Sequence, residues 1–163
     1  MAVPMAQASR VRSADPIRGR KFALSHKKKV PPTILLVEHH LLFLKLIKGI
    51  LEAADFRVLA ARSPKEAKAI EADFPGKIDL LLSEVMMSTR LLGTKLAQTL
   101  KERRPHMRVM LMSAYPGGEL LILNYGWHFI EHPFLAEALV GRIKDVLVSH
   151  RSEQGTDHFD TRE

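Results

Sequence analysis

The stretch LLLSEVMM, residues 80–87, decides the fold of this chain. Three leucines and a serine lead directly into Glu84, and apolar residues resume at once with Val85. A carboxylate beside an apolar run is unfavourable unless it is paired, bound to a metal or placed at an edge that water reaches. We therefore interpret the run as a buried strand whose end, at Glu84, lies at the edge of a sheet.

Strands and helices alternate on both sides of this run. Short apolar runs predict five strands, and longer segments with helical spacing predict five helices. The expected strands cover residues 33–37, 57–61, 78–83, 107–113 and 127–131, and the expected helices cover residues 41–55, a segment from Ser63, 94–104, 118–126 and 135–150. This alternation predicts an α/β fold, a doubly wound five-stranded parallel sheet with helices on both faces.

Two helices carry specific signals. The first has apolar residues at positions 43, 46, 47, 50 and 54, which is helical spacing. The second begins at SPKE, where Ser63 is a typical N-cap, Pro64 suits the first helical position, and Glu66 completes a capping box.

Ionisable or hydroxyl side chains interrupt the apolar pattern where four strands end. The carboxyl ends of parallel strands share one edge of a sheet, and ligands bind there where the strand order reverses. We therefore expect these residues to surround one cleft: Glu38, His39 and His40 after the first strand, Glu84 after the third, Ser113 after the fourth, and His132 with Pro133 after the fifth.

The motifs ILLVEHH, LLLSEVMMSTRLLG, MLMSAY and FIEHPF occur in this order. In order and spacing the chain resembles the receiver domain of two-component response regulators over residues 33–149. The resemblance implies a flavodoxin-like, CheY-like architecture, phosphorelay signal transduction in the cytoplasm, and a cis bond between His132 and Pro133. In that family an acidic pair and an acceptor aspartate hold Mg²⁺, and the aspartate takes a phosphoryl group.

The departures from the family pattern fall on this chemistry. Glu38 and His39 stand at the acidic pair, Glu84 at the acceptor, and His132 at the lysine, whereas Ser113 fits. Mg²⁺ prefers oxygen ligands in near-ideal octahedral geometry, so an imidazole suits it poorly. Glutamate is longer than aspartate, and ~1 Å of misplacement can cost ~100-fold in rate. The sequence therefore predicts a degenerate receiver, or pseudo-receiver, without efficient phosphoryl acceptance.

Several interpretations of the individual residues stay open. For Glu84 we favour a partly solvated rim carboxylate paired with His132 or His39, over a phosphoacceptor or a metal ligand. The favoured interpretation of Glu38, His39 and His40 is a solvated turn. Ser113 is expected to be a strand-end hydroxyl. If a metal binds, the set Glu38, His39, Glu84 and His132 suits zinc better than magnesium, but no cofactor is expected.

The net charge is concentrated at the start of the chain. Residues 1–30 contain eight basic residues and one acid, which accounts for the whole net charge of +7. We expect residues 1–32 to be a disordered basic arm and residues 150–163 a disordered polar tail. There is no cysteine, which excludes disulfides, thiolate catalysis and cysteine-based zinc sites. No apolar run is long enough to cross a membrane.

Taken together, the sequence predicts a stand-alone interaction module in two-component signalling and not an enzyme. The expected partner is a histidine kinase, an output protein or a second copy of the chain. Two alternatives are a phosphorelay regulator that accepts phosphate at Glu84, and a protein that docks on nucleic acid or anionic lipid through residues 10–29. Consecutive apolar residues in the fourth helix indicate an interface at Leu120, Leu121 and Leu123, unless that segment is irregular and buries them. The resemblance implies that Phe129 is a switch aromatic.

Overall fold

The computed structural model describes residues 30–88, 90–115 and 117–149. The expected arm, apart from its last three residues, and the expected tail lie outside the described residues. Five parallel strands form one sheet in the order β2-β1-β3-β4-β5. They are β1 (Thr33–Val37), β2 (Arg57–Ala61), β3 (Leu80–Glu84), β4 (Arg108–Ser113) and β5 (His128–Glu131). The predicted doubly wound parallel sheet is confirmed.

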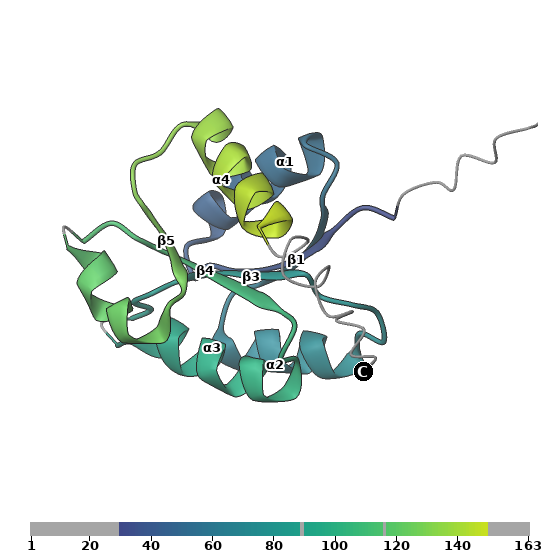
Figure 1. Ribbon diagram of the computed structural model, residues 1–163, viewed down its shortest axis with the longest axis horizontal. Coiled ribbons are helices and arrows are strands. Elements are labelled where there is room, and N and C mark those ends of the chain that lie inside the picture. Colours follow the sequence, from purple (N-terminus) through teal and green to yellow (C-terminus); the bar gives the residue numbers. More distant parts are fainter. Residues whose placement is uncertain (1–29, 89, 116, 150–163) are drawn as a thin grey trace, which may run out of the picture.

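In the described part of the chain, four α-helices cover the two faces of this sheet (Figure 1). They are α1 (Leu41–Ala53), α2 (Pro64–Asp73), α3 (Leu92–Arg103) and α4 (Ala136–Val148). Because side chains alternate along a strand, each strand contributes to both layers. Leu35 and Val37 pack with the α2 and α3 side, whereas Ile34 and Leu36 pack with the α1 and α4 side.

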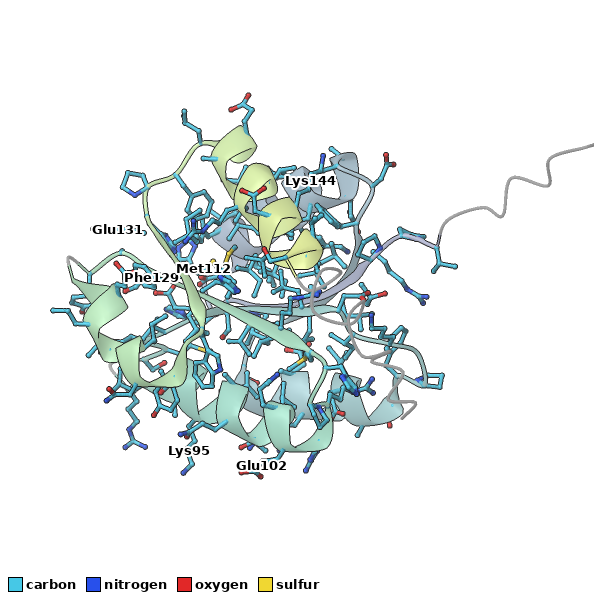
Figure 2. The ribbon with its side chains drawn as sticks, viewed as in Figure 1. Lys95, Glu102, Met112, Phe129, Glu131 and Lys144 are labelled. Atoms are coloured by element: carbon cyan, nitrogen blue, oxygen red, sulfur yellow. The ribbon has the colours of Figure 1, made fainter. Side chains whose placement is uncertain are left out.

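The outer surface of α3 is polar. Figure 2 shows Lys95 and Glu102 pointing away from the sheet on α3. Among the described residues, no helix is both long enough and apolar enough to span a membrane.

The predicted start of α2 is confirmed. Ser63 Oγ accepts a hydrogen bond from the N–H of Glu66, at 3.2 Å, and Pro64 is the first helical residue. Glu66 Oε2 accepts from the N–H of Arg62, at 2.7 Å. The capping box thus closes one residue earlier than the usual pattern. In α1 the predicted apolar stripe is partly wrong, because Leu46 is exposed while Leu44 and Leu51 are buried.

The fourth predicted helix is wrong in type. Residues 118–126 form two short 3₁₀ segments, η1 (Gly118–Leu121) and η2 (Leu123–Tyr125), joined at Ile122. Gly117 and Gly126 bound them with positive φ angles of 75° and 65°. The segment between these glycines is too short to offset the cost of starting an α-helix. Ile122 is buried, and it anchors the segment to the core.

A buried ion pair ties α2 to the end of α3. Glu71 is buried and accepts from Arg104 Nε at 2.7 Å and from Arg103 Nη1 at 3.2 Å. Arg104 also donates to the carbonyls of Glu71, Phe74 and Gly76. These bonds fix the loop that leads from α2 into β3.

Candidate functional site

The strand order reverses between β1 and β3. β1 pairs with β2 on one side and with β3 on the other, and Val37 lies opposite Ser83. Glu38 and Glu84 follow these two paired residues directly, so they enter the same edge of the sheet side by side. A parallel sheet binds its ligands at this position.

Glu38 is buried, contrary to the solvated turn favoured from the sequence. The residue is 1% exposed. Oε1 accepts from the N–H of His40 at 2.7 Å and lies 3.2 Å from His39 Nδ1, while Oε2 is buried without a hydrogen-bond partner among the described residues. Burial raises the pKa of Glu38, and the adjacent Glu84 carboxyl adds to this rise, against the His40 N–H and His39, which lower it. The fold therefore makes ionisation of the Glu38 carboxyl less favourable than it is for a free glutamate.

Glu84 is also buried, and its partner is His132. The residue is only 7% exposed, so the predicted partly solvated rim carboxylate is in fact buried. Its Oε2 lies 3.5 Å from His132 Nε2, one of the two pairings that the sequence suggested. This separation is at the limit for a hydrogen bond, and Nε2 has no hydrogen-bond partner among the described atoms. The two side chains therefore lie in contact without a formed hydrogen bond.

Packing fixes the ring of His132 in place. Its centroid lies 4.7 Å from that of Phe43 and 5.2 Å from that of Phe134. The bond from His132 to Pro133 is cis, as the resemblance implies. Sequence analysis did not assign Phe43 to the site, although a large aromatic in the first turn after a strand end is a usable signal.

Gly93 allows α3 to approach the end of β3. A Cβ at this position would lie 1.9 Å from the carbonyl oxygen of Glu84. The N–H of Gly93 donates to the carbonyl of Val85 at 3.0 Å. Only glycine permits this close backbone contact, which sets where the Glu84 side chain begins.

His39 and His40 lie at the solvent-exposed rim. His40 is the N-cap of α1, and its Nδ1 accepts from the N–H of Phe43 at 3.4 Å. Its role is therefore structural, while His39 contacts Glu38 from the solvent side.

Ser113 lies at the same edge, but its hydroxyl belongs to a different cluster. Oγ accepts from the N–H of Tyr115 at 3.1 Å. A Cβ at Gly118 would lie 3.0 Å from Ser113 Cβ and 3.0 Å from Phe129 Cζ. The side chain of Ser113 thus packs under η1 beside the half-buried Phe129, on the sheet face that α2 and α3 cover. The predicted strand-end hydroxyl is confirmed.

The site brings a carboxyl pair, Glu38 and Glu84, together with the imidazole of His132. Across residues 30–88, 90–115 and 117–149, no three His, Asp or Glu side chains form a group that could hold a metal ion. Glu38 Oε1 is already occupied by the His40 N–H and His39. These residues do not fit the Mg²⁺ site that the family resemblance implies.

Large apolar side chains are exposed near this edge. Leu120 on η1 is 71% exposed, Leu121 is also exposed, and the side chain of Leu123 is outside the description. On α1, Leu42 is 72% exposed and Leu41 and Leu46 are exposed as well. Two apolar patches, on η1 and on α1, therefore lie open to solvent in the single chain.

Solved structures similar to this chain are receiver domains. A CheY-like response regulator receiver domain protein from Methanospirillum hungatei has 25% identity and a TM-score of 0.67, covering 76% of this chain and 98% of that one. A response regulator from Thermotoga maritima has 27% identity and a TM-score of 0.63, covering 73% and 99%. The receiver domain of the hybrid histidine kinase CckA has 29% identity and a TM-score of 0.61, covering 71% and 98%.

A comparison with curated protein sequences finds no match. The family model for the response regulator receiver domain matches residues 34–144, which is more than half of the chain. This protein therefore belongs to the response regulator receiver domain family of two-component signalling.

Proposed function

We propose that this receiver domain is degenerate: it acts as an interaction module in two-component signalling and does not accept a phosphoryl group efficiently. The observation that supports this most is the state of Glu84. The residue at the acceptor position lies against His132 and beside a second buried carboxyl, Glu38, whose pKa is raised by burial.

Phosphoryl transfer depends on positioning and on neutralising the charge of the phosphoryl oxygens. In this site the cation position is occupied by an imidazole, which carries a full charge only when protonated. The raised pKa of Glu38 indicates a low local ability to hold further negative charge. An incoming phosphoryl group would add charge to a site that already disfavours it, without a Mg²⁺ ion to offset it. The same reasoning leads us to propose that the protein is not an enzyme.

The exposed leucines support the interaction role. Exposed apolar patches on a small domain mark contacts with other proteins. The η1 patch, Leu120 and Leu121, and the α1 patch, Leu41, Leu42 and Leu46, flank the edge that carries Glu84. We propose that one of these patches binds a signalling partner, a histidine kinase or output protein, or a second copy of the chain.

A direct test uses a small-molecule phosphodonor with Mg²⁺ and intact-mass spectrometry. We expect the mass of the wild type to stay unchanged. A stoichiometric phosphoryl adduct that disappears in Glu84→Ala would contradict the proposal and establish the alternative, a phosphorelay regulator that accepts phosphate at Glu84. The variant Glu38→Asp/His39→Asp/Glu84→Asp/His132→Lys restores the family residues, and acceptance by this variant alone would show that these four positions account for the loss.

Light scattering tests the contact surfaces. Leu121→Glu and Leu42→Glu each place a charge on one exposed patch, and Lys95→Glu is a charged control on the outer side of α3. If one patch carries a homodimer, its variant becomes monomeric while the control keeps the mass of the wild type. If all are monomeric, pull-downs with each variant identify the patch that a partner needs. Retention of every partner by both leucine variants would contradict the interface assignment.

A further inference from the structure

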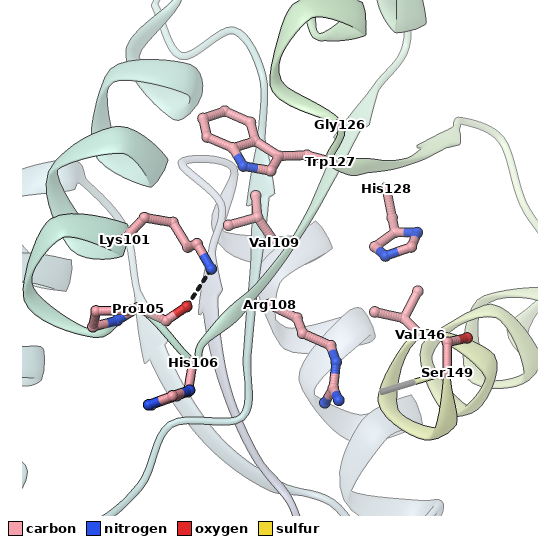
Figure 3. Close-up of a pocket in the computed structure, with 10 residues that line it drawn as sticks. All are labelled: Lys101, Pro105, His106, Arg108, Val109, Gly126, Trp127, His128, Val146 and Ser149. Atoms are coloured by element: carbon pink, nitrogen blue, oxygen red, sulfur yellow. Dashed lines mark hydrogen bonds between the residues drawn. The ribbon is translucent and has the colours of Figure 1, made fainter. Parts of the chain in front are cut away.

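A second hollow lies at the opposite end of the sheet from Glu38 and Glu84. It has a volume of about 400 Å³ and lies at the amino ends of β4 and β5, between the ends of α3 and α4 (Figure 3). Small-molecule pockets are typically about 300–1,000 Å³, so this hollow is large enough for a ligand the size of a nucleotide.

The ionisable side chains that line this hollow are basic, and two of them, Lys101 and Arg108, carry a positive charge. Lys101, His106, Arg108 and His128 contribute to the lining, and none of the described residues that line the hollow is Asp or Glu. Figure 3 shows that these side chains come from three elements and from the loop before β4. A cationic lining without carboxylates favours a negatively charged ligand.

Arg108 has its donors available. Its guanidinium forms no hydrogen bond or ion pair with the residues that the structure describes. The Lys101 ammonium donates to the carbonyls of Pro105 and Met107. These bonds hold the ammonium on the α3 side of β4, so Arg108 is the cation with free donors. The planar fork of arginine matches the oxygens of a phosphate group.

The pKa of His128 is lowered in this region, in part by positive charge. Burial lowers its pKa first, and the nearby positive charges of Arg142 and Arg108 lower it further. A bound anion would act in the opposite direction. The pKa of the His128 imidazole can therefore be used to measure whether an anion is bound in the hollow.

Trp127 supplies an apolar wall. Its ring stacks on Tyr125 with centroids 4.2 Å apart and an angle of 10° between the planes. Tyr125 in turn accepts a hydrogen bond from Gln98 of α3, at 3.2 Å. The indole is thus held in one orientation before any ligand arrives, which lowers the entropy cost of binding.

A wider basic groove adjoins the hollow through Pro105, His106 and Arg108. Arg57, Lys77, Arg103 and Lys144 line it, together with Asp79, which pairs with Lys77 at 2.7 Å, and with Glu52 and Asp55. The excess of cations at this end of the sheet would raise the local concentration of anions.

We propose that this hollow binds a small phosphomonoester, with the phosphate at Arg108 and the organic part reaching around the amino end of β4 to Trp127. The proposal does not depend on the state of the Glu84 site. It assigns to the amino end of the sheet a binding function separate from the carboxyl end.

Trp127 is the only tryptophan of the chain, so intrinsic fluorescence reports directly on this hollow. The probes are AMP, inorganic phosphate and adenosine, titrated into the full-length protein. AMP should change the fluorescence saturably, phosphate should bind more weakly and compete with it, and adenosine should have no effect. By NMR, AMP should raise the pKa of His128. Equal affinity for AMP and phosphate would overturn the role given to Trp127.

The key variant is Arg108→Gln, with Arg62→Gln, an exposed arginine after β2, as the matched control. A hydrogen bond to a charged group contributes about 1.5–3 kcal/mol, so Arg108→Gln should weaken AMP binding about tenfold or more. Arg108→Lys keeps the charge without the planar fork, so its affinity for AMP should lie between those of the wild type and Arg108→Gln. It also serves if Arg108→Gln does not fold. No saturable response to AMP, or equal binding by the Arg108 and Arg62 variants, would overturn the proposal.

Discussion

Glu71 and Glu38 are both buried glutamates, but the fold pairs them very differently. Glu71, near the amino ends of the strands, has both oxygens bonded to arginines. Glu38, at the carboxyl ends, has one oxygen engaged and the other buried without a hydrogen-bond partner among the described residues. A fully paired buried charge holds a structure together, whereas an incompletely paired one lowers stability. The amino end of the sheet therefore carries a structural ion pair, whereas the carboxyl end carries the candidate functional site.

The largest effect is expected at the amino end of the sheet. Arg104→Met removes the less exposed of the two arginine partners of Glu71 and the bonds to three carbonyls, and breaking a buried pair costs about 3–5 kcal/mol. Urea unfolding measures the loss. Arg103→Met, whose side chain is half exposed, should cost only about 0–1 kcal/mol. Equal losses in the two variants would remove the distinction between a buried and a surface pair.

The next effect is expected at Gly93, which sets the backbone of the site. Gly93→Ala places a Cβ against the carbonyl of Glu84, so α3 or the end of β3 must shift, at about 1–3 kcal/mol. Gly49→Ala in α1 is the control, since nothing lies within 4 Å of its Cβ position. It should stabilise the helix by about 0.5–1 kcal/mol. Thermal unfolding of both variants tests the difference in sign.

A smaller effect of opposite sign is expected at Glu38. At neutral pH, Glu38→Gln should stabilise the protein by about 1 kcal/mol, because an amide needs no ionisation and can donate to Glu84. The pKa of Glu38 is higher in the folded state than its ordinary value of 4.5. Its favourable contribution is therefore complete below 4.5 and is lost as the pH rises through the folded pKa.

The measurement is urea unfolding of the wild type and of Glu38→Gln, at pH values from below 4.5 up to neutral. The advantage of the variant should grow as the pH rises and vanish at low pH. Glu102→Gln, an exposed glutamate on α3, should show no such trend. An advantage for Glu38→Gln that does not depend on pH would contradict the raised pKa.

The smallest effect is expected from metal ions. Neither Mg²⁺ nor Zn²⁺ should raise the melting temperature of the wild type more than that of His39→Ala/His132→Ala, since these side chains form no metal-binding group. A zinc-specific rise that is lost in the double variant would instead establish a zinc site at the carboxyl edge.

The sequence by itself determined the fold class, the five strands, the start of α2 and which residues follow the strand ends. These features depend on local periodicity and capping, which neighbouring residues decide. The fourth helix could not be predicted with the same success, because two glycines and a single buried anchor, Ile122, set its form.

Only the tertiary structure decided how buried the site residues are and which groups they contact. Glu38 was expected in a solvated turn and Glu84 at a partly solvated rim, but both are buried. His132, which packs against Phe43 of α1, lies against Glu84. Ser113 turned to the other face of the sheet through the alternation of β4. The Glu71–Arg104 pair and the hollow around Arg108 join residues from distant segments. Burial and charge pairing depend on contacts across the whole chain, and local pattern does not contain them.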